Sequence, residues 1–144
     1  LLERANSIIF IDPYFNPFKP DYEEFDLILQ AIKRADDPPD IEIHLCHLES
    51  PKTARDYEDY FPQKLANVIK EARLKVQFFI WDSFHDRYII TNLVGIMSGN
   101  SFSVSREMEE TTWTRLDRQG KDEVQMEFDK NCKKHKLQRY FIIS

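Results

Sequence analysis

A histidine and an arginine stand two residues apart at the head of an apolar run that ends near residue 92. If that run is a strand, its side chains alternate between two faces, so we expect His85 and Arg87 to emerge on one face. Gly95 and Gly99 follow and free backbone amides nearby. An imidazole and a guanidinium beside such amides predict a phosphate-binding site.

Apolar runs and amphipathic segments predict the elements that must hold this site. Strands are expected at residues 7–11, 41–46, 75–81, 87–91, 94–98 and 111–116, and residues 139–143 are either a last strand or a packed tail. Helices are expected at residues 23–35, within 53–73 and at 121–134. Pro62 should lie in the first turn of the second helix or break a turn before it. This order predicts an α/β fold with a mixed β-sheet flanked by helices on both faces. The strands at residues 87–91 and 94–98 should pair through a turn at Asn92-Leu93.

The first strand ends at Asp12-Pro13-Tyr14, where Pro13 removes a ladder donor. Sites in open α/β sheets gather at the carboxyl ends of strands, so Asp12 and Tyr14 are candidate neighbours of the site. The alternative is that Asp12 only caps the following turn.

Length and charge limit the class of protein. We expect one domain over the 144 residues, as part of a longer protein, with a core typical of a globular chain that is 42% hydrophobic and 31% charged. A net charge of −5 argues against indiscriminate binding to nucleic acid or anionic membranes. The first 50 residues carry 4 basic and 11 acidic side chains and the rest carry 16 and 14, so an anion site should lie in the second part. The basic tail, which we define as Lys130, Lys133, Lys134, Lys136 and Arg139, is a solvated face or a surface for a phosphate-bearing partner.

The cysteines and the first histidines suggest no metal centre. Cys46 and Cys132 lack metal-ligand spacing, which is typical of a reduced, cytoplasmic protein. The chain shows no membrane-spanning run, so we expect a cytoplasmic location or one at the periphery of a membrane. His44 and His47 are expected in structural roles, with metal binding as the weaker alternative.

The spacing around His85 carries a family resemblance. The basic residue stands at plus two, Asn92 at plus seven and Gly99 at plus fourteen. This register resembles the phospholipase D superfamily motif, His-x-Lys, four residues, Asp, six residues, Gly-Ser-x-Asn. Within that superfamily the chain is similar to the C-terminal phospholipase D-like domain found behind MIT modules and to its bacterial relatives. The matching pieces are Asp12-Pro13-Tyr14, Ile43-His44-Leu45, His85-Asp86-Arg87, Asn92 and Glu110-Thr111-Thr112.

The resemblance implies one half of the phospholipase D fold over most of residues 7–116. It also implies phosphoryl chemistry without a metal or cofactor, in which one histidine attacks phosphorus and another protonates the leaving oxygen. A chain with one motif then needs a symmetric homodimer. By this resemblance His85 would be the nucleophile, Arg87 would clamp the phosphoryl oxygens, and Glu110 would orient His85.

Three positions depart from the motif. Arg87 replaces its lysine, Asn92 replaces its aspartate, and Gly99-Asn100-Ser101-Phe102 replaces Gly-Ser-x-Asn. Because the lysine and amide changes fall on the phosphate clamp, we expect a module that binds a phosphate-bearing ligand, a phospholipid headgroup or nucleic acid, or a protein partner, as a homodimer. The alternative is a metal-independent phosphodiesterase or nuclease with a phosphohistidine at His85 and an active site shared across the homodimer. The expected ligand-binding residues are Asp12, Tyr14, Asn92, Gly99, Asn100 and Ser101.

Overall fold

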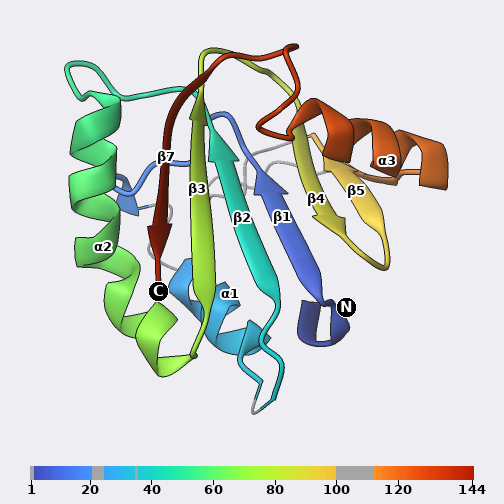
Figure 1. Cartoon of the computed structure of the whole chain (residues 1–144), viewed down its shortest axis with the longest axis horizontal. Coiled ribbons are helices and arrows are strands. Elements are labelled where there is room, and N and C mark those ends of the chain that lie inside the picture. Colours follow the sequence, from blue (N-terminus) through green and yellow to red (C-terminus); the bar gives the residue numbers. More distant parts are fainter. Residues whose placement is uncertain (1, 21–24, 35, 100–111) are drawn as a thin grey trace.

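A computed structural model describes residues 2–20, 25–34, 36–99 and 112–144. Its centre is a seven-stranded mixed sheet with the order β6-β5-β4-β1-β2-β3-β7 (Figure 1). The strands are β1 (Ser7–Ile11), β2 (Asp40–Leu45), β3 (Lys75–Trp81), β4 (Arg87–Thr91), β5 (Gly95–Ser98), β6 (Trp113–Arg115) and β7 (Leu137–Ile143). The helices are α1 (Phe25–Ile32), α2 (Ala54–Glu71) and α3 (Arg118–Glu127), with a 3₁₀ turn at Leu2–Arg4. The predicted α/β class is confirmed.

The first three strands run parallel and adjacent, so their carboxyl ends meet at one edge of the sheet. We call this the carboxyl edge. Strand β4 pairs antiparallel with β1, with Tyr88 opposite Ile11, and therefore begins at that same edge. Strand β5 returns antiparallel to β4 through Asn92-Leu93, as predicted, and so ends there. Strands β6 and β7 complete the two sides of the sheet in antiparallel pairings.

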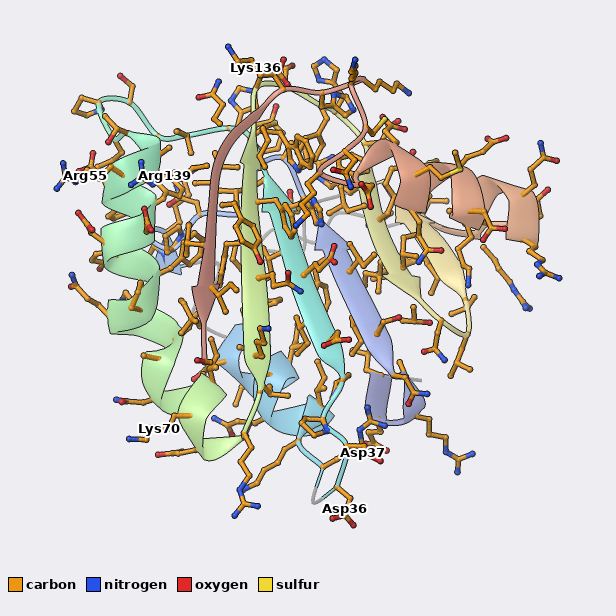
Figure 2. The ribbon with its side chains drawn as sticks, viewed as in Figure 1. Asp36, Asp37, Arg55, Lys70, Lys136 and Arg139 are labelled. Atoms are coloured by element: carbon orange, nitrogen blue, oxygen red, sulfur yellow. The ribbon has the colours of Figure 1, made fainter. Side chains whose placement is uncertain are left out.

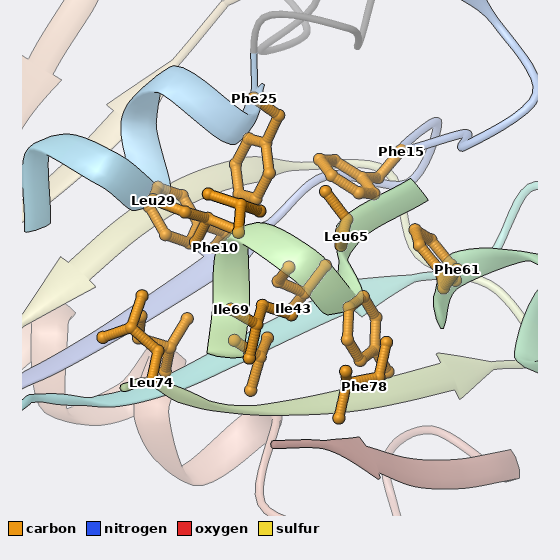
Figure 3. Packing of buried hydrophobic residues seen from close by; sticks show 14 of the residues in the cluster. Phe10, Phe15, Phe25, Leu29, Ile43, Phe61, Leu65, Ile69, Leu74 and Phe78 are labelled. Carbon is orange, nitrogen blue, oxygen red and sulfur yellow. The ribbon is translucent and has the colours of Figure 1, made fainter. Parts of the chain in front are cut away.

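Helices α1 and α2 cover one face of the sheet, and their side chains form the larger core. Phe10 of β1 meets the ring of Phe25 edge to face at 5.2 Å, and Phe61 of α2 packs on Phe78 of β3 at 4.5 Å (Figure 3). Crossover helices on one side are what a sequential β1-β2-β3 order requires when the connections are right-handed. A smaller core on the opposite face joins α3 to the sheet through Trp81, Val124 and Phe128 and their neighbours. Helices thus cover both faces, as expected.

Helix α2 begins at a capping box. The Thr53 hydroxyl accepts a hydrogen bond from the Asp56 N–H at 3.3 Å, and the Asp56 carboxylate accepts one from the Thr53 N–H at 2.7 Å. Pro62 lies inside this helix, so its expected place in the first turn or at a break was wrong. The helix continues past the proline because Tyr57, Phe61 and Leu65 on either side of it are buried in the core.

Helix α3 starts earlier and ends earlier than residues 121–134. Asp117 caps it, and its side chain accepts a hydrogen bond from the Gly120 N–H at 2.7 Å. After Glu127 the chain turns, because the Asp129 carboxylate accepts a hydrogen bond from the Asn131 N–H at 2.8 Å. Cys132 therefore lies beyond the helix. The C-terminal residues, left open as strand or tail, form the full strand β7.

Candidate functional site

The carboxyl edge collects the residues that the sequence singled out as chemical. Asp12, Pro13 and Tyr14 leave β1, Cys46 and His47 leave β2, and His85 and Arg87 enter β4. Strand β5 ends at the same edge, where Ser98 pairs with Arg87, and Gly99 follows it directly. This is where sites form in open α/β sheets, because the chain reverses direction and leaves backbone and side chains exposed.

Arg87 is held on three sides at this edge. Its Nε lies 3.5 Å from Asp12 Oδ1, and its guanidinium carbon lies 5.2 Å from the centre of the Tyr14 ring. Its Nη1 donates to the Gly99 carbonyl at 3.5 Å. The Asp12 side chain is 1% exposed and that of Arg87 is 19% exposed. The guanidinium is therefore oriented by the buried Asp12 carboxylate and by its contacts with Tyr14 and Gly99 before any ligand arrives.

The Arg87 guanidinium keeps unused hydrogen-bonding capacity. Its Nε is buried and makes no hydrogen bond to any described residue, so the contact with Asp12 is electrostatic. Within the described part of the chain, no hydrogen-bond acceptor is found for Nη2. A phosphate oxygen could accept from Nη2 while Asp12 continues to hold the other side.

Asp12 also shapes its own loop. Its Oδ1 accepts a hydrogen bond from the Tyr14 N–H at 3.0 Å, and its N–H donates to the His44 carbonyl at 3.0 Å. Asp12 therefore caps the turn, as one interpretation predicted, but this is not its only contact. The same carboxylate faces Arg87, so one residue both closes the turn and orients the guanidinium.

Tyr14 links Arg87 to His47. The rings of Tyr14 and His47 stack with centroids 4.5 Å apart and planes 8° from parallel. Strands β4 and β2 flank β1 on opposite sides, and Arg87 from the first and His47 from just after the second both contact the Tyr14 ring. The His47 N–H donates to the Pro13 carbonyl at 2.6 Å, which fixes the two loops together. The result is a stacked Arg87–Tyr14–His47 row whose middle ring is 45% exposed.

The row includes a residue that the sequence analysis did not assign to the site. His47 was expected in a structural role, and no spacing rule relates it to Arg87. The only available signal was its place directly after the second strand, at the edge where Asp12 was expected.

His85 does not share a strand face with Arg87. Strand β4 begins at Arg87, and residues 83–86 form a loop. Phe84 anchors this loop because its N–H contacts Cys46 Sγ at 3.4 Å and its buried ring meets Phe128 at 4.9 Å. The expectation of one shared face was wrong for this reason. His85 instead lines a separate cavity beside α3, and its imidazole is exposed.

Asn92 lies at the opposite end of β4 from Arg87. Its Oδ1 accepts a hydrogen bond from the Asn6 N–H at 2.8 Å, which ties the N-terminal segment to the β4–β5 turn. The structure therefore does not bring Asn92 to the Arg87 site. Gly99 does reach that site, as its carbonyl contact with Arg87 shows. Glu110, Asn100 and Ser101 lie outside the described residues.

His44 is structural, as expected. Its ring is fully buried, accepts a hydrogen bond from Trp81 Nε1 at Nδ1 over 2.9 Å, and lies 2.9 Å from Glu42 Oε2 at Nε2. Burial lowers the pKa of this imidazole, and the Glu42 carboxylate opposes that shift. His44 is therefore a neutral link between β2 and β3 behind the site.

Most of the basic tail is already occupied by partners within the chain. Arg139 pairs with Glu58, Lys134 pairs with Glu127 at 3.1 Å, and Lys130 lies 5.9 Å from the Tyr140 ring centre. Lys136 lies at the carboxyl edge, whereas Asp36 and Asp37 lie at the opposite end of the sheet (Figure 2). The described residues contain no group of three or more His, Cys, Asp or Glu side chains that could hold a metal ion. Among the described helices, none is long and apolar enough to cross a membrane.

Comparisons with known proteins show structural likenesses but no family. The chain matches no protein-family model and no curated protein. It is similar to the structure of TrmBL2, an archaeal chromatin protein described as showing a novel mode of DNA binding, with 20% sequence identity and a TM-score of 0.50. The match covers 94% of this chain and 46% of that one, so the chain spans about half the length of that protein. At this identity the likeness concerns the fold alone.

Proposed function

We propose that this chain is a phospholipase D-like module that binds a phosphate-bearing ligand at the carboxyl edge, with Arg87 as the phosphate clamp. The observation that carries the proposal is the arginine itself. It is mostly buried, held by Asp12 and Tyr14, and left with Nη2 free to donate among the described residues. A guanidinium prepared in this way binds phosphate with little loss of side-chain freedom.

A nucleic acid is the ligand that we favour, over a lipid headgroup or a protein partner. The partly exposed Tyr14, which contacts Arg87, and the His47 ring stacked on it place aromatic groups next to the phosphate clamp. Proteins that bind single strands combine these two features. The similarly folded TrmBL2 is described as binding DNA, which agrees with this choice.

The second candidate function is a metal-independent phosphodiesterase that uses His85. It is favoured by the exposed imidazole of His85, for which the described residues offer no hydrogen-bond or ion-pair partner. In either case we expect a homodimer, which light scattering on the purified chain would measure directly.

Binding measurements with three probes test the first proposal. Fluorescence anisotropy would follow a labelled single-stranded oligonucleotide, with inorganic phosphate as competitor, and co-sedimentation would use vesicles rich in anionic phospholipid. We expect oligonucleotide binding that phosphate weakens and that Arg87→Ala reduces at least tenfold. Arg118→Ala, which removes an equal charge at the start of α3, should bind as wild type does. Vesicle binding without oligonucleotide binding would assign the lipid headgroup instead. If no probe binds, or if Arg87→Ala binds as wild type does, the proposed clamp is wrong.

A further inference from the structure

A second concave site opens at the carboxyl edge, on the face that carries α3. It is a cavity of about 230 Å³ that no part of the Arg87 site lines. Its walls come from the loop before β4, from α3 and from the segment that leads into β7. The lining residues are Ser83, Phe84, His85, Asp86, Tyr88, Glu127, Phe128 and His135. Two imidazoles from distant parts of the sequence therefore face one small space.

His135 is held in the orientation of a general base. Its Nε2 lies 2.8 Å from Glu127 Oε1, and its ring stacks on Phe128 with centroids 5.4 Å apart. A carboxylate only accepts hydrogen bonds, so Nε2 carries the proton and Nδ1 presents a lone pair. Within the described residues Nδ1 has no hydrogen-bond partner. A carboxylate that fixes an imidazole in this manner is the arrangement that prepares a proton acceptor.

His85 faces the same cavity without a fixed role in the fold. It makes no hydrogen bond or ion pair to any described residue, and its ring is exposed. The nearby Tyr88 hydroxyl is engaged, because it donates to Asp86 Oδ2 at 3.2 Å, and burial raises the pKa of Tyr88 to about 12. The cavity thus offers two proton carriers and a tyrosine that is a poor nucleophile. Such a site suits an ester that carries its own nucleophile.

RNA is the phosphate ester that meets this condition, because a 2′-hydroxyl stands beside each phosphorus. The cavity is also close to the phosphate clamp, since two residues of extended chain separate the His85 and Arg87 Cα atoms by at most about 7 Å. A single RNA strand could therefore place one phosphate on Arg87 and the next phosphate in the cavity.

We propose that this cavity is a metal-independent RNA-cleaving site contained in a single chain, with His135 as general base and His85 as general acid. It rests on the proposed function, since Arg87 would hold the neighbouring phosphate. His135 Nδ1 takes the proton of the 2′-hydroxyl as the 2′-oxygen forms its bond to phosphorus. The bond from phosphorus to the 5′-oxygen breaks, and His85 in its protonated form gives its proton to that oxygen. The products are a 2′,3′-cyclic phosphate and a free 5′-hydroxyl. Solvent then restores both imidazoles to their starting protonation states.

Cleavage of a labelled single-stranded RNA in EDTA tests this site. We expect wild type to yield 2′,3′-cyclic ends and to leave the matching DNA intact. His85→Ala and His135→Asn should each slow cleavage about 100-fold or more while RNA binding is retained. His135→Asn keeps a polar side chain beside Phe128, and circular dichroism would verify its fold. Glu127→Gln should lower kcat with little change in KM, because the role of Glu127 is to position the base, His135.

The matched control is Met126→Ala. Met126 is on α3 beside Glu127, is 70% exposed and does not line the cavity, so its loss should leave cleavage unchanged. Wild type that binds RNA through Arg87 yet never cleaves it would overturn the cleavage site and leave the proposed binding function standing. Cleavage of DNA at the same rate, or full activity in His135→Asn, would also overturn it. Failure of wild type to bind any phosphate-bearing probe would remove both proposals.

Discussion

Replacing His44 with phenylalanine should change the stability of this protein in a way that depends on pH. Phenylalanine preserves the ring that stacks on Phe79 with centroids 4.4 Å apart. It removes the acceptor of the Trp81 Nε1–H bond and leaves that buried donor unsatisfied. An unsatisfied buried donor costs about 1–3 kcal/mol, so at pH 7.5 His44→Phe should lower the free energy of unfolding by this amount.

In mild acid, the difference in free energy of unfolding between the wild-type protein and His44→Phe should become smaller. In the unfolded chain His44 takes up a proton near the ordinary pKa of 6.5, whereas burial lowers its pKa in the folded chain. Protons then bind preferentially to the unfolded chain, so stability falls as the pH drops below 6.5 toward the folded pKa. One pH unit below 6.5, at pH 5.5, this loss is at most about 1.4 kcal/mol. Phenylalanine does not titrate, so the gap between the two proteins should narrow.

Urea unfolding of wild type and His44→Phe at pH 7.5 and 5.5 measures this gap. Other titrating groups are common to both proteins and cancel in the difference. We predict a gap that is largest at pH 7.5 and smaller at pH 5.5. A gap that stays constant, or grows in acid, would refute the assignment of His44 as a buried neutral imidazole.

Two further predictions concern the stability of the fold, one at the start of helix α2 and one at the start of strand β5. Thr53→Ala removes the hydroxyl of the capping box of α2 and should lower the free energy of unfolding by about 0.5–2 kcal/mol, measured by urea unfolding; an unchanged midpoint would show that the cap contributes nothing. Gly95→Ala should destabilise by about 1–3 kcal/mol, because the new Cβ would lie 2.9 Å from Lys121 Cγ and 3.1 Å from Ile90 Cδ1. Lys121 cannot move aside freely, since its Nζ donates to the Thr91 carbonyl at 3.1 Å; a melting temperature equal to that of wild type would contradict this packing.

Strand positions were predictable where an apolar run was clearly bounded in the sequence. Residues 7–11, 75–81 and 87–91 match the observed β1, β3 and β4. In β1 the stop is Pro13, which cannot donate to the ladder, and the run before it is β-branched and apolar. Such signals are local, so they can be recognised without knowing the rest of the fold.

Helix boundaries were less predictable because single side chains set them. Helix α3 starts earlier than predicted because Asp117 caps it. It ends earlier because the Asp129 side chain accepts a local backbone hydrogen bond. Pro62 was tolerated inside α2 because tertiary burial outweighed the lost hydrogen bond. The first two outcomes depend on whether one side chain forms a local hydrogen bond, and the third depends on packing partners that are distant in sequence.

The candidate site was predictable in place but not in detail. Asp12 and Tyr14 were predicted to lie beside the site because they follow the carboxyl end of a strand, and both contact Arg87. The stacking of Tyr14 on His47 depends on the lateral strand order β4-β1-β2, which hydrophobic patterns do not encode. His135 reaches the cavity of His85 only because β7 adds to the far side of β3 and its preceding loop crosses the edge.

The central claim is that Arg87 binds a phosphate group, and a double-mutant cycle tests it most directly. The affinity of wild type and Arg87→Ala would be measured for one short oligonucleotide with and without a terminal phosphate at the bound position. A hydrogen bond to a charged group contributes about 1.5–3 kcal/mol, so we predict that Arg87→Ala weakens binding of the phosphorylated ligand by roughly 10- to 150-fold and has little effect on the other. Equal losses for both ligands would show that Arg87 supports the fold of the edge and does not bind the phosphate.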